Sequence, residues 1–112
     1  NFSLLQTSLP NWYLQKGMNN KKHMHSIGKR LRKARILMGY SREDVRQALG
    51  VQSTSHISDW ERGVRLPGII NLLKLSVLYK TLPDSLLHEL RQDAVAHVGK
   101  WMKKVEKKKR RK

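Results

Sequence analysis

The sequence contains no cysteine, which excludes both a disulfide framework and a thiolate metal site. It also lacks any apolar run near the roughly 18 residues that indicate a membrane-spanning helix, so we expect no membrane partner. Acidic residues are scarce, with 8 Asp or Glu against 24 Lys or Arg among 112 residues. With 38% hydrophobic residues, a chain of this length can bury one compact core but not two independent ones.

The excess of basic residues gives a formal net charge of +16 and is concentrated at two places. Residues 21–35 contain seven Lys or Arg and no acid, and residues 100–112 contain nine with Glu106 as the one acid. Such an excess indicates a polyanionic partner, and nucleic acid is the commonest one. Because the rest of the chain is nearly neutral, we expect specific recognition there and bulk attraction to phosphates at the basic segments.

The apolar pattern divides the chain into three parts. Residues 1–22 show no clean helical spacing and contain Pro10 and Gly17, so they are interpreted as an arm or a disordered leader. Met18 is an alternative natural start, because the chain opens on Asn1. Residues 23–92 are predicted to form the folded domain, and residues 93–112 a helical extension that frays into a basic tail.

Capping signals mark the first two helices of the predicted domain. Ser26 is suited to begin the first helix and Gly39 to end it in the left-handed conformation. Ser41, with Asp44 three residues later, forms a loose capping box for a short second helix that stops at Gly50. The first helix carries one apolar stripe, made of Ile27, Leu31, Ala34 and Met38.

Three further helices follow, and no segment alternates with period two, so the predicted fold class is all-α. They are expected over Ser53–Arg62, over Ile69–Tyr79 and from Pro83 onward, the last continuing through Val105. The fourth is apolar nearly all round and is therefore expected to be central and buried. The predicted core consists of Ile27, Leu31, Val45, Leu49, Val51, Ile57, Trp60 and Leu73.

The third predicted helix has two very different faces. At 100° per residue, Ile57 and Trp60 share one side, while the opposite side carries Ser55, Ser58, Asp59 and Arg62. Small polar side chains allow a helix to approach base edges closely in the major groove of DNA, and their donors and acceptors can read those edges. The alternative is that these residues are merely solvated, as on any surface helix.

The motifs around this helix resemble those of the Cro and phage-repressor (XRE-type) helix-turn-helix family. The resemblance covers residues 27–90 and includes Gly39-Tyr40-Ser41, Gly50-Val51, Trp60-Glu61-Arg62-Gly63 and Leu66-Pro67. It implies a lambda-repressor-like domain of five helices, here with a C-terminal helical extension and a basic tail. The segment from Gly50 to Trp60 is one residue longer than is usual in the family, which leaves the register of residues 52–54 open by one position.

Carried over by position, the resemblance assigns roles to individual residues. The base-reading positions are Gln52, Thr54, Ser55, Ser58 and Asp59. The phosphate-binding positions are Ser41, Arg42, His56, Arg62 and Arg65. Arg35 and Glu61 are expected to form a buried ion pair with a structural role. Asp59 is left open: it either accepts a hydrogen bond from a cytosine amine or turns aside toward Arg62.

Other chemistry is not indicated by the sequence. The five histidines, at positions 23, 25, 56, 88 and 97, predict no metal site, because only "HMH" places two together and no cysteine or carboxylate cluster completes a set. Ser55, His56 and Asp59 include the residue types of a catalytic triad, but such close positions on one helix point away from one another. We therefore expect neither an enzyme nor a cofactor.

The sequence thus predicts a sequence-specific DNA-binding transcriptional regulator, a repressor by analogy with the family, located at the nucleoid in the cytoplasm of a bacterium or phage-infected cell. We expect a homodimer on double-stranded DNA, joined through the stripe of Ala94, Val98, Trp101, Met102 and Val105. Two alternatives stay open. One is an antitoxin of the same fold that binds a toxin through residues 1–17 or 98–105; the other is an RNA- or ribosome-associated protein resembling the multiprotein bridging factors.

Overall fold

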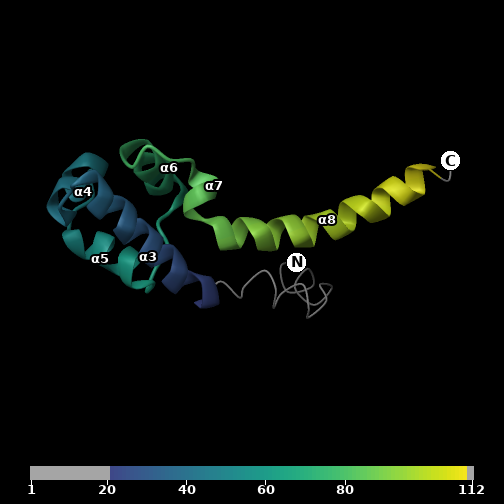
Figure 1. Ribbon diagram of the computed structural model, residues 1–112, viewed down its shortest axis with the longest axis horizontal. Helices are drawn as coiled ribbons and strands as arrows, with labels where there is room; N and C mark the ends of the chain where they lie inside the picture. Colours follow the sequence, from purple (N-terminus) through teal and green to yellow (C-terminus); the bar gives the residue numbers. More distant parts are fainter. Residues whose placement is uncertain (1–20, 111–112) are drawn as a thin grey trace, which may run out of the picture.

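The computed structural model describes residues 21–110, so the predictions for the N-terminal arm fall almost entirely outside the described residues. This part of the chain contains helices and no strand, which confirms the all-α fold class (Figure 1). The helices are α3 (Lys21–Met38), α4 (Arg42–Leu49), α5 (Thr54–Arg62), α6 (Ile69–Leu78), α7 (Pro83–Leu86) and α8 (His88–Arg110).

Helices α3 to α7 form a compact bundle, and α8 leaves it as a long rod (Figure 1). Helix α3 packs mainly against α5, and α4 lies against both α5 and α6. The core draws on every helix from α3 to α7. It consists of Ile27, Leu31, Val45, Leu49, Ile57, Trp60, Leu72, Leu75, Tyr79 and Leu86.

The ends of α4 and α5 follow the local signals in the sequence. The Ser41 hydroxyl accepts a hydrogen bond from the Asp44 backbone N–H, and the Ser41 N–H donates to the Asp44 carboxylate, which completes the predicted capping box. The Ser53 hydroxyl caps α5 by accepting from the Ser55 N–H at 3.1 Å. Both helices end on a left-handed glycine, Gly50 (φ 74°) and Gly63 (φ 76°), a conformation that residues with a Cβ rarely adopt.

Gly28 allows an unusually close approach between α3 and α5. A Cβ atom at this position would lie 2.5 Å from the carbonyl oxygen of Glu61 and 2.7 Å from that of Trp60. These atoms belong to the backbone and cannot rotate away. The distance between the two helix axes therefore depends on the absence of a side chain at Gly28, a requirement that the sequence analysis did not detect.

The expectation that the fourth helix is central and buried is wrong. Helix α6 lies at the edge of the bundle and buries only one stripe, through Leu72, Leu75 and Ser76. Leu73, which was assigned to the core, is 47% exposed, because it lines an open hollow between α6 and α4 rather than a closed core. Of the other predicted core residues, six are buried and Val51 is half-buried against the core.

Two predicted helix boundaries also need correction. Helix α3 is already helical at Lys21, before the predicted cap Ser26, and its first turns are held by a contact of His23 with α8. The predicted fifth helix is two helices, because Leu87 (φ −109°, ψ 35°) interrupts it between α7 and α8. The basic end does not fray as predicted: α8 continues to Arg110, since Lys, Glu and Arg are good helix formers and cations favour a helix C-terminus.

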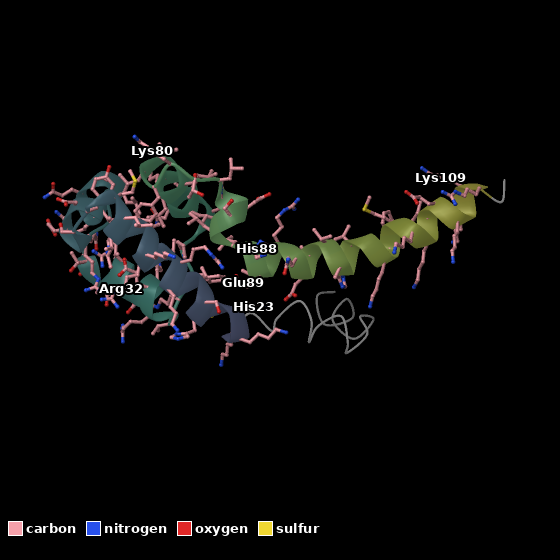
Figure 2. The ribbon with its side chains drawn as sticks, in the orientation of Figure 1. His23, Arg32, Lys80, His88, Glu89 and Lys109 are labelled. Atoms are coloured by element: carbon pink, nitrogen blue, oxygen red, sulfur yellow. The ribbon has the colours of Figure 1, made fainter. Side chains whose placement is uncertain are left out.

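The first turns of α8 are fastened to α3 by polar contacts. The Arg30 guanidinium donates to the Leu86 carbonyl at 3.1 Å and forms a two-pronged ion pair with Glu89, which holds the pKa of that carboxyl below its ordinary value. His23 contacts Asp93 at 2.8 Å. Figure 2 shows His23 and Glu89 together where the two helices meet. Within residues 21–110, no helix is both long and apolar enough to span a bilayer.

The close approach at Gly28 predicts a sharp difference between two glycine substitutions in helices. We expect Gly28→Ala to lower the free energy of unfolding by about 1–3 kcal/mol, because the added methyl group meets fixed backbone. Gly99→Ala is the matched control: nothing lies within 4 Å of its Cβ, so stability should not fall and helicity should rise slightly. Chemical unfolding followed by circular dichroism measures both. Equal stability of the two variants would contradict the packing described here.

Candidate nucleic-acid interface

Helix α5 turns its apolar side into the bundle and leaves its hydroxyl-bearing side uncovered. Ile57, Trp60 and Glu61 are buried, whereas Ser55 is exposed. On the same outer side, Arg62 is exposed and Ser58 and Asp59 are half-buried, and the flanking Thr54 and His56 are half-buried as well. The face that the helical wheel singled out is therefore in contact with solvent, most of all at Ser55 and Arg62.

The turn between α4 and α5 holds α5 in place. Arg46 of α4 pairs with Glu43 at 2.7 Å, and its guanidinium also donates to the Val51 carbonyl at 3.2 Å. Gln52 is exposed in this turn. Helix α5 begins at Thr54, so residues 50–53 form the turn and Ile57 and Trp60 lie within one continuous helix.

Asp59 pairs with two arginines. Its carboxylate lies 2.7 Å from Arg62 and 3.9 Å from Arg65, and its side chain is only 22% exposed. Of the two roles left open by the sequence, the structure has Asp59 turned toward Arg62. The pairing neutralises a carboxylate that would repel phosphates, while the arginines remain 62% and 70% exposed at the end of α5.

The predicted ion pair between α3 and α5 is present. Arg35 donates to both carboxylate oxygens of Glu61, at 2.7 and 3.1 Å, and a further guanidinium nitrogen donates to the Tyr40 carbonyl at 3.0 Å. The Glu61 side chain is 2% exposed. The hydrogen bond to Glu61 raises the pKa of Arg35, and burial raises the pKa of nearby Tyr79. This pair joins α3, α5 and the turn after α3.

Arg42 also contacts Glu61, and this contact was not expected from the sequence. Its Nε lies 3.2 Å from a carboxylate oxygen of Glu61, yet 42% of its side chain is exposed. Two guanidinium groups, of Arg35 and Arg42, thus share the one buried carboxylate of Glu61. The signal in the sequence was indirect: a buried Glu61 offers two oxygens, and Arg42 is the first residue of the helix that packs on α5.

The other predicted phosphate-binding groups lie around the same helix pair. Ser41 precedes α4, and its backbone N–H is already used by Asp44, so only its hydroxyl proton remains to be donated. His56 lies half-buried on α5. Between residues 21 and 110, no group of three His, Cys, Asp or Glu is arranged to hold a metal ion.

Comparison with known proteins agrees with this arrangement. A family model described as helix-turn-helix matches residues 31–86, which are 56 of the 112 residues. The chain belongs to this helix-turn-helix family, of the Cro and phage-repressor type. The matched segment runs from α3 to α7 and includes both α4 and α5, so the family domain is the bundle and α8 lies beyond it.

Two relatives show how far the helix-turn-helix similarity extends. The chain is 40% identical over 62 residues to the HTH-type transcriptional regulator ImmR of Bacillus subtilis, a match that covers 55% of this chain and 48% of that protein. The chain thus spans about half the length of this curated relative. The crystal structure of the restriction-modification controller protein C.AhdI from Aeromonas hydrophila matches with a TM-score of 0.53 and 31% identity, over 58% of this chain and 97% of that one.

The buried position of Glu61 predicts a large loss of stability when its charge is removed. We expect Glu61→Gln to lower the free energy of unfolding by about 3–5 kcal/mol, because Arg35 is then buried without a counter-charge. Asp59→Asn is the matched control on the same helix and should cost less than about 1 kcal/mol, since its arginine partners are exposed.

Chemical unfolding of both variants measures the difference. The double variant Arg35→Met/Glu61→Met should recover part of the loss, because neither partner of the buried pair is then left charged. If Glu61→Gln unfolds at the same denaturant concentration as Asp59→Asn, the carboxylate does not have the role described here.

Proposed function

We propose that this protein is a sequence-specific DNA-binding transcriptional regulator that inserts α5 into the major groove. The observation that carries the proposal is the uncovered hydroxyl-bearing side of α5, opposite the buried Ile57 and Trp60. A helix with short polar side chains on its outer side can approach base edges and exchange hydrogen bonds with them. The names of both relatives describe regulators, which favours this function over the antitoxin and RNA-binding alternatives, and over catalysis.

The side chains around α5 divide into two groups under this proposal. Thr54, Ser55 and Ser58, with Gln52 in the preceding turn, are proposed to contact bases. Arg42 contacts a phosphate with the guanidinium nitrogens that Glu61 does not engage.

Arg62 and Arg65 contact phosphates beyond the C-terminus of α5, with Asp59 orienting them rather than reading a base. Ser41 and His56 are placed to add contacts to the backbone of the same duplex. The exposed Lys29, Arg32 and Lys33 of α3 attract DNA without selecting a sequence. Occupation of a promoter would repress transcription, and the protein would act at the nucleoid in the cytoplasm.

Two substitutions separate base reading from phosphate binding. We expect Ser55→Ala to reduce the preference for one base at a single position of the DNA site by about 1–3 kcal/mol. The reason is that the Ser55 hydroxyl is exposed on the outer side of α5. Arg42→Ala should instead weaken all duplexes to a similar extent and lower the salt dependence of binding. Selection of sites from random duplexes, followed by titration at several salt concentrations, measures both effects.

The matched controls are Ser85→Ala and Arg91→Ala, an exposed serine of α7 and an exposed arginine of α8. Neither control should change the selected sequence. An unchanged preference in Ser55→Ala, with unchanged affinity in Arg42→Ala, would contradict the proposed interface.

A second copy of the chain is proposed to cover the aliphatic side of α6. Ile70, Leu73 and Val77 are 62%, 47% and 78% exposed there. Val77 lines two open hollows of about 370 and 350 Å³, one with Ala48 and Leu49 and the other with Leu82 and Pro83. A two-fold interface uses the same patch on both copies, so the exposed Val77 of each copy could pack into a hollow of the other, and paired recognition helices suit half-sites about one DNA turn apart. We therefore propose this side of α6 as the dimer interface, in place of the apolar stripe on α8 that was predicted from the sequence.

The dimer proposal predicts a specific loss of self-association. We expect Val77→Asp to convert the dimer to a monomer, because two-fold symmetry brings both carboxylates to an apolar contact. Ile36→Asp is the matched control, an aliphatic position on the outer side of α3 with 56% exposure. Analytical ultracentrifugation of the full chain distinguishes the two variants. A monomeric wild type, or a dimeric Val77→Asp, would contradict the proposal.

A further inference from the structure

Helix α8 packs loosely against the bundle. No residue of this helix is buried, and the side chains of Glu89 and Asp93 near its start contact α3. Beyond that point four apolar side chains are about half-exposed or more: Val95 at 55%, Val98 at 48%, Trp101 at 63% and Met102 at 52%. Figure 1 shows this part of α8 extending away from the other helices. A stable helix that leaves tryptophan and aliphatic side chains in water presents a surface for a partner.

The free part of α8 is amphipathic, with cations opposite the apolar side. At 100° per residue, six apolar residues fall within a sector of about 120°: Ala94, Val95, Val98, Trp101, Met102 and Val105. Lys100, Lys103, Lys107 and Arg110 fall on the opposite side, and Lys104 and Lys108 flank the apolar sector. Lys109 falls within the angular range of the apolar sector, but beyond Val105 and near the free end of the helix (Figure 2). The occupant of this surface must therefore accept apolar side chains and positive charge together.

A second copy of α8 fits this surface poorly. The apolar sector extends from Ala94 to Val105, which is shorter than the three to four heptads, roughly 21–28 residues, that a coiled coil requires. A parallel pairing would also bring two clusters of seven Lys or Arg from residues 100–110 into contact. The phosphates of duplex DNA would pair with these cations, but DNA would leave the apolar sector exposed to water.

We propose that residues 94–110 of α8 bind the surface of an anionic lipid bilayer. The apolar sector lies at the boundary between headgroups and acyl chains, where tryptophan is favoured, and the lysines contact the anionic headgroups. Clusters of four to eight Lys or Arg on an amphipathic helix have the charge that such surfaces attract. The sequence analysis expected no membrane partner because no segment can span a bilayer, but a helix lying in the interface needs no spanning run.

This proposal goes beyond DNA binding and does not depend on it. The molecule is 56 Å long, and the free end of α8 lies at the opposite end from α5 (Figure 1). The ion pair of Arg30 with Glu89 and the contact of His23 with Asp93 fix the start of α8 on the bundle. Binding of the free end to a bilayer therefore leaves the outer side of α5 uncovered.

The test uses the full chain and vesicles of two compositions, phosphatidylcholine alone and an equal mixture with phosphatidylglycerol. We expect binding to the mixed vesicles only, with a blue shift of tryptophan emission. The variant Val98→Ser/Trp101→Ser/Val105→Ser keeps every charge and should lose more than about tenfold in affinity for mixed vesicles. Lys103→Glu/Lys107→Glu should lose a similar amount. Ile36→Ser, an exposed aliphatic position on α3, is the control and should bind as the wild type does.

Three results would overturn the proposal. Undiminished vesicle binding by the Val98, Trp101 and Val105 variant would mean that charge alone drives the attraction. A smaller oligomer for this variant in the absence of lipid would assign the apolar sector to a second copy. An equal loss of affinity for duplex DNA would assign the sector to nucleic acid. This variant leaves α5 unaltered. If it keeps the wild-type affinity for duplex DNA, the DNA-binding function is supported whether or not the protein binds vesicles.

Discussion

The burial of the Glu61 carboxylate between two arginines constrains the rest of the bundle. A carboxylate with a side chain only 2% exposed must be paired, because burying an unpaired charge is very costly. Its partners come from two other helices, Arg35 from α3 and Arg42 from α4. Since Glu61 directly follows Trp60 on α5, this pairing fixes the rotation of α5 about its own axis. With α5 in this rotation, Ser55 faces outward.

The ion pairs set the rotation of α5, and Gly28 sets its distance from α3. The backbones of the two helices approach so closely that a methyl group at Gly28 would lie 2.5 Å from a carbonyl oxygen of α5. The bidentate contact of Arg35 with Glu61 spans the same pair of helices and needs that short separation. Packing and electrostatics thus require the same placement of α5, which is the consistency expected of a uniquely folded domain.

The sequence was sufficient where structure depends on neighbouring residues in the chain. Ser41 with Asp44, Ser53 and the left-handed Gly50 and Gly63 fix helix ends through local hydrogen bonds, and all were readable from spacing. Of the long-range features, the Arg35–Glu61 pair was expected only through the family resemblance, and two others were not readable. Leu73 is exposed because too few helices surround α6, a property of the assembled bundle. The contact of Arg42 with Glu61 joins residues on different helices, and no periodicity in the sequence indicates it.

The ion pairs show which basic residues are neutralised by carboxylates and which carry the net charge. In the described residues, six carboxylates pair with arginine or histidine, and none pairs with lysine. Arginine suits this structural role because its planar guanidinium meets a carboxylate in two places. The lysines therefore account for most of the unneutralised charge. Of the twelve in residues 21–110, six lie on α8 and two in the first turn of α3. In the described residues, arginine is thus the usual partner of the carboxylates, and the lysines lie outside these pairs.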